Sequence, residues 1–264
     1  MVFYFTGTGN SLYAAAQLDA RTCSIPQAIR RGCLKFSDSE IGIVCPVYGH
    51  EMPVMVQEFL KKAELKTDYL YLILTYGSFQ GNAAELAEKV LAAAGKKADY
   101  IRTLLMPDNF LPDFDMEIEK KLDKNVEGQP AEIRADLAAH RRYREPVTDE
   151  QRRLHAEYAE GMNGEPVTLW ADFEVGDACT GCGVCTRVCP AGCFRLENRR
   201  AVRSAENCQA CYSCIQNCPQ KAIGITRYVG FSEKNPGSRY RNEHVTLEDI
   251  MAANDQHVSQ KKAD

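Results

Sequence analysis

The sequence predicts an α/β protein with a doubly wound parallel sheet in its first half and a smaller α+β unit in its second half. Two observations support this prediction. In the first half, near-continuous apolar runs alternate with helical stretches, as strands buried on both faces of a parallel sheet require. In the second half, nine of the twelve cysteines lie between Cys179 and Cys218, which indicates a unit organised around these side chains.

Composition limits the function classes. The chain has 264 residues, of which 45% are hydrophobic, so it can form the cores of one large and one small domain. Its net charge of −4 and the lack of a Lys/Arg block disfavour nucleic acid as a partner. No apolar run approaches the ~20 residues that span a bilayer, and Val2–Phe5 carries no export signal, so we expect a cytoplasmic protein without a membrane span. Twelve cysteines in such a chain indicate bound metal rather than disulfides.

Five strands are expected in the first half. They lie at residues 1–5, 24–29, 41–48, 69–74 and 100–106, and the second is the weakest. Helices are expected between them: one has Pro53 in its first turn, and another is capped by Asn82 with Glu85 and ends at Gly95. Five strands suit a sheet of order 2-1-3-4-5, whose ligand lies at the carboxyl ends of the strands where the order reverses.

The loop after the first strand is the first candidate site. Its glycines allow close backbone approach and its polar side chains stand at a helix N-terminus, which favours a phosphate monoester. The candidate residues are Thr6, Gly7, Thr8, Gly9, Asn10 and Ser11. A tight turn without a ligand is the simplest alternative. A dinucleotide site is a second alternative. Such a site has Gly-x-Gly-x-x-Gly or Ala, and Leu12 stands at the last position of this motif. Arg30 and Arg31 would accept a 2′-phosphate, however, so this alternative stays open.

This loop resembles the FMN phosphate loop of the flavodoxins. The resemblance implies a flavodoxin-like FMN domain over residues 1–112, with two further loops that flank the flavin. The residues that match these loops are Pro46, Val47, Tyr48 and Gly49, and Thr75, Tyr76, Gly77, Gly81 and Asn82. Tyr48 is the candidate for stacking on the flavin ring, with ordinary packing as the alternative. His50 is a weaker candidate, and Cys45 is expected to be a small buried core residue.

Residues 113–165 are expected to form a charged helical bridge between the two domains. From Asp113 to Glu160, 22 of 48 residues are charged, against roughly one-quarter in typical soluble domains. We therefore expect two or more exposed amphipathic helices, one of them capped by Thr148 and Gln151. These helices would serve as solvated spacers or, alternatively, dock a redox partner.

The cysteines of the second half form two runs with two-, two- and three-residue spacing, each followed by proline. Bacterial ferredoxins have this ligand pattern, in which the fourth cysteine of each run binds the other cluster. One [4Fe–4S] cluster is then assigned to Cys179, Cys182, Cys185 and Cys218, and the other to Cys208, Cys211, Cys214 and Cys189. Zinc is disfavoured because a tetrahedral zinc site uses two separated Cys-x-x-Cys pairs and no third cysteine. Cys193 belongs to neither set and is expected to pack.

Residues 166–227 thus resemble a two-cluster ferredoxin domain, with a hairpin at 194–202 and a strand at 222–226. The tail, residues 228–264, is expected to be largely a mobile end. Within it, Ser238–Asn242 is a segment that would fold back, and Thr246 with Asp249 is predicted to cap a short helix.

The whole chain resembles a family of anaerobic redox proteins in which flavodoxin and ferredoxin modules are fused. The resemblance implies electron transfer between an FMN and two [4Fe–4S] clusters, with redox proteins as partners and no catalytic residue. The alternative is an enzyme, an FMN-dependent reductase of a small substrate, for which Tyr48, His50 and Tyr76 are the nearby titratable groups. A redox sensor is a third interpretation, and no DNA-binding element supports it.

Overall fold

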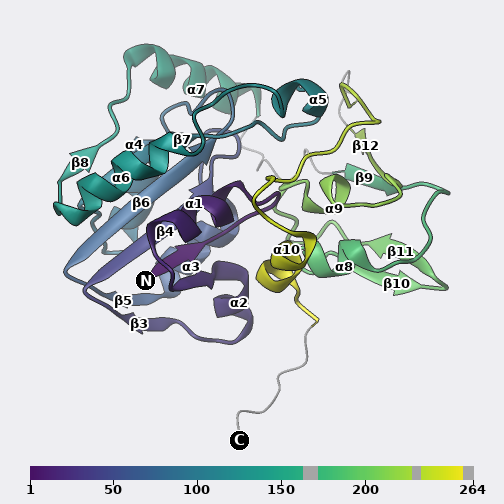
Figure 1. Cartoon of the computed structure of the whole chain (residues 1–264), viewed down its shortest axis with the longest axis horizontal. Helices are drawn as coiled ribbons and strands as arrows, with labels where there is room; N and C mark the ends of the chain where they lie inside the picture. Colours follow the sequence, from purple (N-terminus) through teal and green to yellow (C-terminus); the bar gives the residue numbers. More distant parts are fainter. Residues whose placement is uncertain (163–171, 228–232, 258–264) are drawn as a thin grey trace, which may run out of the picture.

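The computed structural model describes residues 1–162, 172–227 and 233–257 and contains a six-stranded parallel sheet (Figure 1). The strands lie in the order β2-β1-β4-β6-β7-β8. Their bounds are β1 Val2–Tyr4, β2 Thr22–Ser24, β4 Glu40–Pro46, β6 Tyr69–Tyr76, β7 Tyr100–Leu105 and β8 Tyr143–Arg144. The first five strands confirm the predicted order 2-1-3-4-5, and β8 is an unexpected sixth. A separate parallel pair consists of β3, Lys35–Ser37, and β5, Glu64–Lys66.

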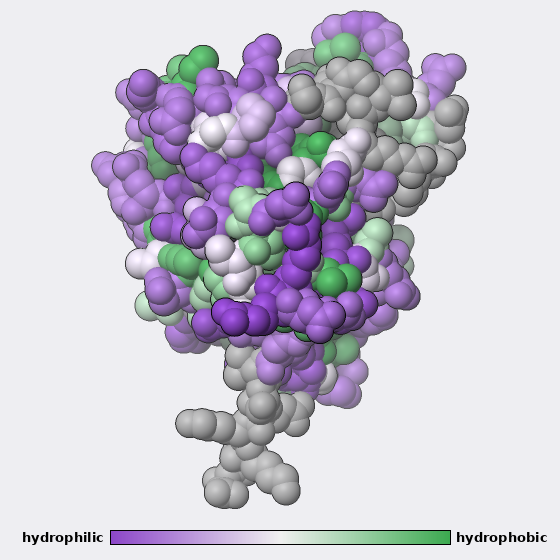
Figure 2. All heavy atoms as spheres, turned by 90° about the vertical axis from the view of Figure 1, so that its right-hand side faces the viewer, coloured by the Kyte–Doolittle hydropathy of each residue, from purple (hydrophilic) through white to green (hydrophobic). Residues whose placement is uncertain are grey.

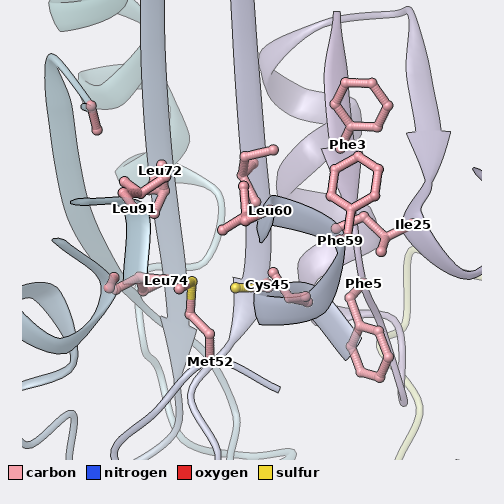
Figure 3. Packing of buried hydrophobic residues seen from close by; sticks show 14 of the residues in the cluster. Phe3, Phe5, Ile25, Cys45, Met52, Phe59, Leu60, Leu72, Leu74 and Leu91 are labelled. Carbon is pink, nitrogen blue, oxygen red and sulfur yellow. The ribbon is translucent and has the colours of Figure 1, made fainter. Parts of the chain in front are cut away.

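Helices cover both faces of the sheet, and each face has its own core. One face carries α2 Ile25–Arg30, α3 Val54–Lys62 and α4 Ala83–Ala93; the other carries α1 Asn10–Leu18 and α6 Gly128–Ala138. Phe3 packs in the first core against Phe59 of α3, while Val2 and Tyr4 lie in the second core. This alternation is the period of two that a strand imposes on its side chains. Cys45 is fully buried in the first core, as predicted (Figure 3).

Residues 25–30 correct the prediction for the second strand. They form α2, and the preceding strand β2 is only three residues long. The Ser24 side chain accepts a hydrogen bond from Gln27 N, and Pro26 stands in the first helical turn. A capping serine followed by proline is a strong helix start, and here it prevails over the apolar character of the segment.

The ends of α3 and α4 follow local signals with one exception. Pro53 is the N-cap residue of α3, next to the first-turn position expected for it. Asn82 is the N-cap residue of α4, but its side chain makes no capping hydrogen bond, so the predicted capping box with Glu85 is wrong. Gly95 follows the end of α4 with φ +67°, the left-handed conformation that ends helices, as predicted.

The cysteine-rich unit lies beside the sheet and is built from two small antiparallel pairs and two short helices (Figure 1). Its elements are β9 Asp172–Val175, α8 Val184–Val188, β10 Phe194–Glu197, β11 Arg200–Arg203, α9 Ser213–Gln216 and β12 Ile223–Arg227. The predicted hairpin is confirmed by the pairing of β10 with β11, and the predicted last strand pairs with β9. Figure 2 shows that this side of the molecule is mostly hydrophilic, with only small hydrophobic patches.

Part of the charged bridge packs against the sheet of the first half of the chain, which corrects the prediction that its helices are exposed spacers. It contains α5 Met116–Glu119, α6, β8 and α7 Asp149–Gly161. Ile133 and Leu137 of α6 are buried in the second core, and β8 joins the sheet beside β7. α7 is an exposed helix, and its capping box of Thr148 and Gln151 is present as predicted. Residues 163–165 of the predicted bridge lie outside the described residues.

Residues 233–257 form a segment that we call the C-terminal clasp. It ends in α10, Leu247–Asn254, whose capping box of Thr246 and Asp249 is present as predicted. Ile250 is fully buried between the sheet and α8, so the expectation of a mobile end is wrong for this segment. Among the described residues, no helix is both long and apolar enough to cross a membrane.

Candidate cofactor sites

A cavity of about 410 Å³ opens at the carboxyl ends of β1, β4 and β6. Its volume lies in the range of small-molecule sites. The structure brings three predicted loops together here, and the predicted residues that line the cavity are Thr6, Gly7, Thr8, Asn10, Ser11, Pro46, Val47, Tyr48, Gly49, Thr75, Tyr76 and Gly77. Three predicted residues lie outside its lining. Gly9 lies under the clasp, Gly81 packs on His50, and Asn82 is buried at the start of α4.

The side-chain oxygens of the loop after β1 are already bonded within the protein. Asn109 Nδ2 donates to Thr8 Oγ1 at 2.9 Å. Ser11 Oγ and Thr75 Oγ1 lie 2.8 Å apart and share a hydrogen bond. The first backbone N–H groups of α1, by contrast, have no carbonyl partner within the helix, as at every helix N-terminus. A phosphate group placed in this loop would meet backbone N–H groups and the helix dipole, and the Thr8 hydroxyl, which accepts from Asn109, keeps a proton that it could donate.

The C-terminal clasp closes over the same loop. Asn10 Oδ1 accepts hydrogen bonds from Tyr240 Oη at 2.6 Å and from Asn242 Nδ2 at 3.1 Å. Gly9 adopts φ +103°, and a β-carbon on it would lie 3.0 Å from Asn242 Cβ and 3.1 Å from Val245 Cβ. Glycine is thus required at this position both by its backbone conformation and by the approach of the clasp.

Gly7 marks the contact between the loop and the cysteine-rich unit. A β-carbon on Gly7 would lie 2.5 Å from Cys211 O, 3.1 Å from Cys211 Cβ and 3.2 Å from Tyr48 Oη. The sequence indicated that glycines in this loop admit a phosphate. In the structure, the groups that approach Gly7 belong to the chain itself, and the nearest is the carbonyl oxygen of a predicted cluster ligand.

Tyr48 lies between the cavity and the cysteine-rich unit. Its ring lines the cavity and meets Phe5 edge-on, with the ring centres 6.4 Å apart. Its hydroxyl oxygen is buried and has no hydrogen-bond partner among the described residues. Burial, reinforced by the neighbouring Cys211 thiolate, raises the pKa of Tyr48 well above its usual value. Stacking of Tyr48 on a flavin stays a prediction, whereas the position of its hydroxyl is a separate feature that the sequence did not suggest.

Aromatic side chains gather beside the cavity, and two of them were missed by the sequence analysis. His50 contacts Phe79 and Tyr158, with ring centres 5.1 Å and 4.7 Å apart. Its Nδ1 lies 3.3 Å from His155 Nδ1. Burial and the second imidazole lower the pKa of His50 to about 4. His155 and Tyr158 come from α7, whose capping box predicts where the helix starts but gives no sign of where it docks.

The first predicted cluster set surrounds one small cavity in the cysteine-rich unit. Its four members, Cys179, Cys182, Cys185 and Cys218, all line this cavity. Cys218 comes from the second cysteine run, so the structure brings it beside three cysteines of the first run, and its role as a cluster ligand stays a prediction. Burial and the other three thiolates raise the pKa of Cys185 to about 12. Four thiolates at one place repel one another, and a group carrying positive iron charge relieves this repulsion.

The second predicted set is more deeply buried. Cys189, Cys208, Cys211 and Cys214 are all buried, whereas Cys182 of the first set is exposed. Burial raises the pKa of Cys214 well above its usual value, and the Cys189, Cys211 and Cys208 thiolates add to this effect. The fifth cysteine nearby, Cys193, has a buried thiol that donates to Glu206 O at 3.5 Å. Cys193 is packed in the interior, as expected, and it directly contacts Cys189 of this set.

Backbone N–H groups point at three of the cysteine sulfurs. Cys193 N donates to Cys189 Sγ at 3.2 Å, Ala222 N to Cys218 Sγ at 3.3 Å, and Ala201 N to Cys179 Sγ at 3.5 Å. Such bonds stabilise thiolates and tune the potential of a cluster. Within the described residues, no three His, Cys, Asp or Glu side chains converge tightly enough to hold a single metal ion. The four cysteines of the first set instead surround a small cavity, which suits ligands at separate corners of a cluster.

The two candidate sites share a wall. Ala210 and Tyr212 line the large cavity, and Cys211 between them packs in the core of the first half of the chain. Ala210 and Tyr212 have φ +50° and +55°, the left-handed conformation that few residues other than glycine adopt. This conformation bends the loop so that its two sides face different sites. Met55 N donates to the neighbouring Gln209 Oε1 at 2.8 Å and fixes the loop against α3.

Comparison with known proteins agrees with the cysteine geometry. Residues 172–219 match the family described as a 4Fe-4S dicluster domain. A stretch of 52 residues is 48% identical to a component of the ion-translocating oxidoreductase complex of Methanosarcina acetivorans; it covers 20% of this chain and 19% of that protein. The chain thus spans about a fifth of the length of this curated relative.

A solved structure also aligns with part of the chain. The Trp repressor binding protein from Bacillus subtilis matches 40% of this chain and 84% of its own, with a TM-score of 0.30 and 12% identity, and this likeness is too weak to carry an argument. The family match and the ligand geometry together identify residues 172–219 as an iron–sulfur domain with a general role in electron transfer.

Proposed function

We propose that the chain is an electron-transfer protein in which an FMN held in the large cavity exchanges electrons with two [4Fe–4S] clusters. The observation that carries this proposal is the shared wall. The loop that supplies Cys211 to the second cysteine set also supplies Ala210 and Tyr212 to the cavity. A cofactor in the cavity would therefore be separated from that cluster by a single stretch of backbone.

The different burial of the two cysteine sets supports an order in which electrons pass between the cofactors. The second cysteine set lies next to the cavity and is buried, whereas Cys182 of the first set is exposed. We propose that the second set holds the cluster that exchanges electrons with the flavin, and that the first set holds the cluster that faces redox partner proteins. The flavin would supply two-electron chemistry and each cluster one-electron steps. Residues 1–112 with α6 and β8 would form the FMN domain and residues 172–227 the cluster domain.

The cavity residues fit a flavin mononucleotide. The loop after β1 offers backbone N–H groups at a helix N-terminus for the phosphate. The loops at 46–50 and 75–79 offer a mostly apolar wall with Tyr48 and Tyr76 for the ring. Reduction of a small substrate is the alternative function. His50 is a poor proton donor for it at neutral pH, because burial lowers the pKa of its imidazole to about 4.

The first test is cofactor analysis of protein purified without oxygen. We expect one FMN with about eight iron and eight sulfide per chain, as two four-iron clusters require. Iron and sulfide without flavin would refute the flavin part of the proposal and leave an iron–sulfur protein with an unexplained cavity.

The second test follows electrons between the sites. After photoreduction of the flavin, we expect fast flavin reoxidation with bleaching of cluster absorbance in the wild-type protein. Cys211→Ser, which removes a ligand at the shared wall, should abolish this fast phase. The matched variant Cys182→Ser, which alters the exposed set, should retain it. Loss of the fast phase in Cys182→Ser alone would reverse the proposed order of the two clusters.

A further inference from the structure

The Tyr48 hydroxyl is a buried donor without an acceptor among the described residues. A buried hydroxyl that makes no hydrogen bond destabilises the folded protein, so native proteins rarely retain one without a reason. Tyr48 lines the cavity, but its hydroxyl oxygen is inaccessible from it. A ligand in the cavity therefore does not supply the acceptor.

The space around this oxygen belongs to the loop that carries Cys211. A single β-carbon on Gly7 would touch both Tyr48 Oη, at 3.2 Å, and Cys211 Cβ, at 3.1 Å. The two side chains thus border the same small space. Cys211 itself packs with Tyr48 in the core of the first half of the chain, although its sequence neighbours belong to the cysteine-rich unit.

The other polar groups near this hydroxyl do not use it. Cys45 is a fully buried thiol on β4, and a thiol is a weak acceptor. The carbonyl oxygen of Cys211 borders Gly7 and makes no hydrogen bond with Tyr48. The Tyr48 hydroxyl also makes no hydrogen bond with the Cys211 sulfur, and a cluster bound by Cys211 would supply sulfide acceptors in addition to the thiolates.

We infer that the Tyr48 hydroxyl donates a hydrogen bond to a sulfur of the cluster held by Cys208, Cys211, Cys214 and Cys189, and thereby raises the reduction potential of that cluster. This inference rests on the proposed assignment of the second cluster. A tyrosine hydroxyl is protonated at neutral pH and so acts as a donor. Reduction adds negative charge to the cluster, which strengthens the hydrogen bond and stabilises the reduced form.

Tyr48 would then contact both cofactors, with its ring edge against the flavin cavity and its hydroxyl against the cluster. It is a positioning and tuning residue and transfers no proton. Raising the potential of the second cluster makes it a better electron acceptor from the cavity side. The same residue was predicted from sequence to stack on the flavin, and the hydrogen bond proposed here does not depend on that stacking.

The test is an EPR-monitored reductive titration of the complete protein and of Tyr48→Phe. We expect the phenylalanine variant to keep its iron, sulfide and flavin and to lower the midpoint potential of one cluster only. The expected change is about tenfold in the reduction equilibrium, which is ~59 mV for a one-electron couple. Tyr71→Phe is the matched control, because it removes the hydroxyl of another tyrosine, one that is buried in the second core away from the cysteines, and it should shift neither potential.

A second variant keeps the inference testable if Tyr48→Phe does not fold. With 3-fluorotyrosine at position 48, the hydroxyl is retained as a stronger donor, and one cluster potential should rise. Unchanged potentials in either loaded variant would overturn the inference, while FMN and iron at their expected amounts would leave the proposed function intact. A protein that binds no cluster would overturn both proposals, and a protein with clusters but no flavin would overturn only the flavin assignment.

Discussion

Adding one methyl group at Gly7 should push the two halves of the chain apart. The new β-carbon would sit 2.5 Å from Cys211 O, whereas carbon–oxygen contacts in proteins are typically about 3.3–3.6 Å. The Cys211 carbonyl must therefore retreat by roughly 1 Å, together with the loop between the cavity and the second cysteine set. Gly7 is not among the residues with positive φ, so backbone strain adds nothing and the effect is steric.

Overpacking of this kind typically costs about 1–3 kcal/mol, and we expect Gly7→Ala to lower the free energy of unfolding by that amount. Denaturant unfolding under anaerobic conditions measures it. Gly176→Ala is the matched control, because the nearest atom to its new β-carbon is Ala222 O at 3.5 Å, an ordinary contact. The control should remain within about 0.5 kcal/mol of the wild-type protein.

Gly7→Ala should also loosen the second cluster. Since the displaced carbonyl belongs to a predicted ligand, we expect iron to be lost from this variant faster than from the wild-type protein in the presence of a chelator. If Gly7→Ala matched the control in both unfolding and iron retention, the close contact between Gly7 and the Cys211 loop would be refuted.

Three further changes test other parts of the structure. Asn254→Ala removes an amide that donates to two buried carbonyls, and it should lower the free energy of unfolding in denaturant by about 1–3 kcal/mol; an unchanged midpoint would contradict the clasp. Burial lowers the pKa of His50 in the folded protein to about 4 from its usual 6.5. Between these two pH values the unfolded chain binds a proton at His50 and the folded protein does not, so the free energy of unfolding should fall as the pH drops from 6.5 to about 4. His50→Gln should flatten this fall in pH-dependent unfolding; a slope equal to that of the wild-type protein would refute the shift. Cys182→Ala should remove about four of eight iron atoms in a colorimetric assay and exposed Cys33→Ala none, whereas full iron in the first variant would contradict the ligand assignment.

The strand order and the cysteine sites were predictable because their signals are local. The strands β1, β4, β6 and β7 are short apolar runs, and the loops that follow them meet at one edge as the topology requires. The spacing of Cys179, Cys182 and Cys185 predicted a shared site, and the crossing of Cys218 into it follows the same ferredoxin pattern. For these strands and for the three closely spaced cysteines, a few neighbouring residues determine the outcome, whereas the position of Cys218 followed from the resemblance to ferredoxins and not from a local signal.

Features that depend on distant contacts were missed. The charge of residues 113–165 indicated exposure, but α6 buries the narrow stripe of Ile133 and Leu137 and keeps its charges outside. His155 and Tyr158 lie beside the cavity only because α7 docks there, and helix periodicity carries no such information. The buried hydroxyl of Tyr48 depends on the approach of Cys211 from the far half of the sequence.

The C-terminal clasp has a consequence for how the molecule is made. Asn254 Nδ2 donates to Thr6 O at 2.9 Å and to Val188 O at 3.1 Å, so one side chain connects the first loop of the chain to α8, the helix within the first cysteine run. A ribosome synthesises this residue after both structures that it joins. We expect the cavity and the cysteine sites to be accessible to their cofactors while the nascent chain is still open. Docking of α10 would then follow the formation of the loop and the helix that Asn254 joins, as a later step of assembly.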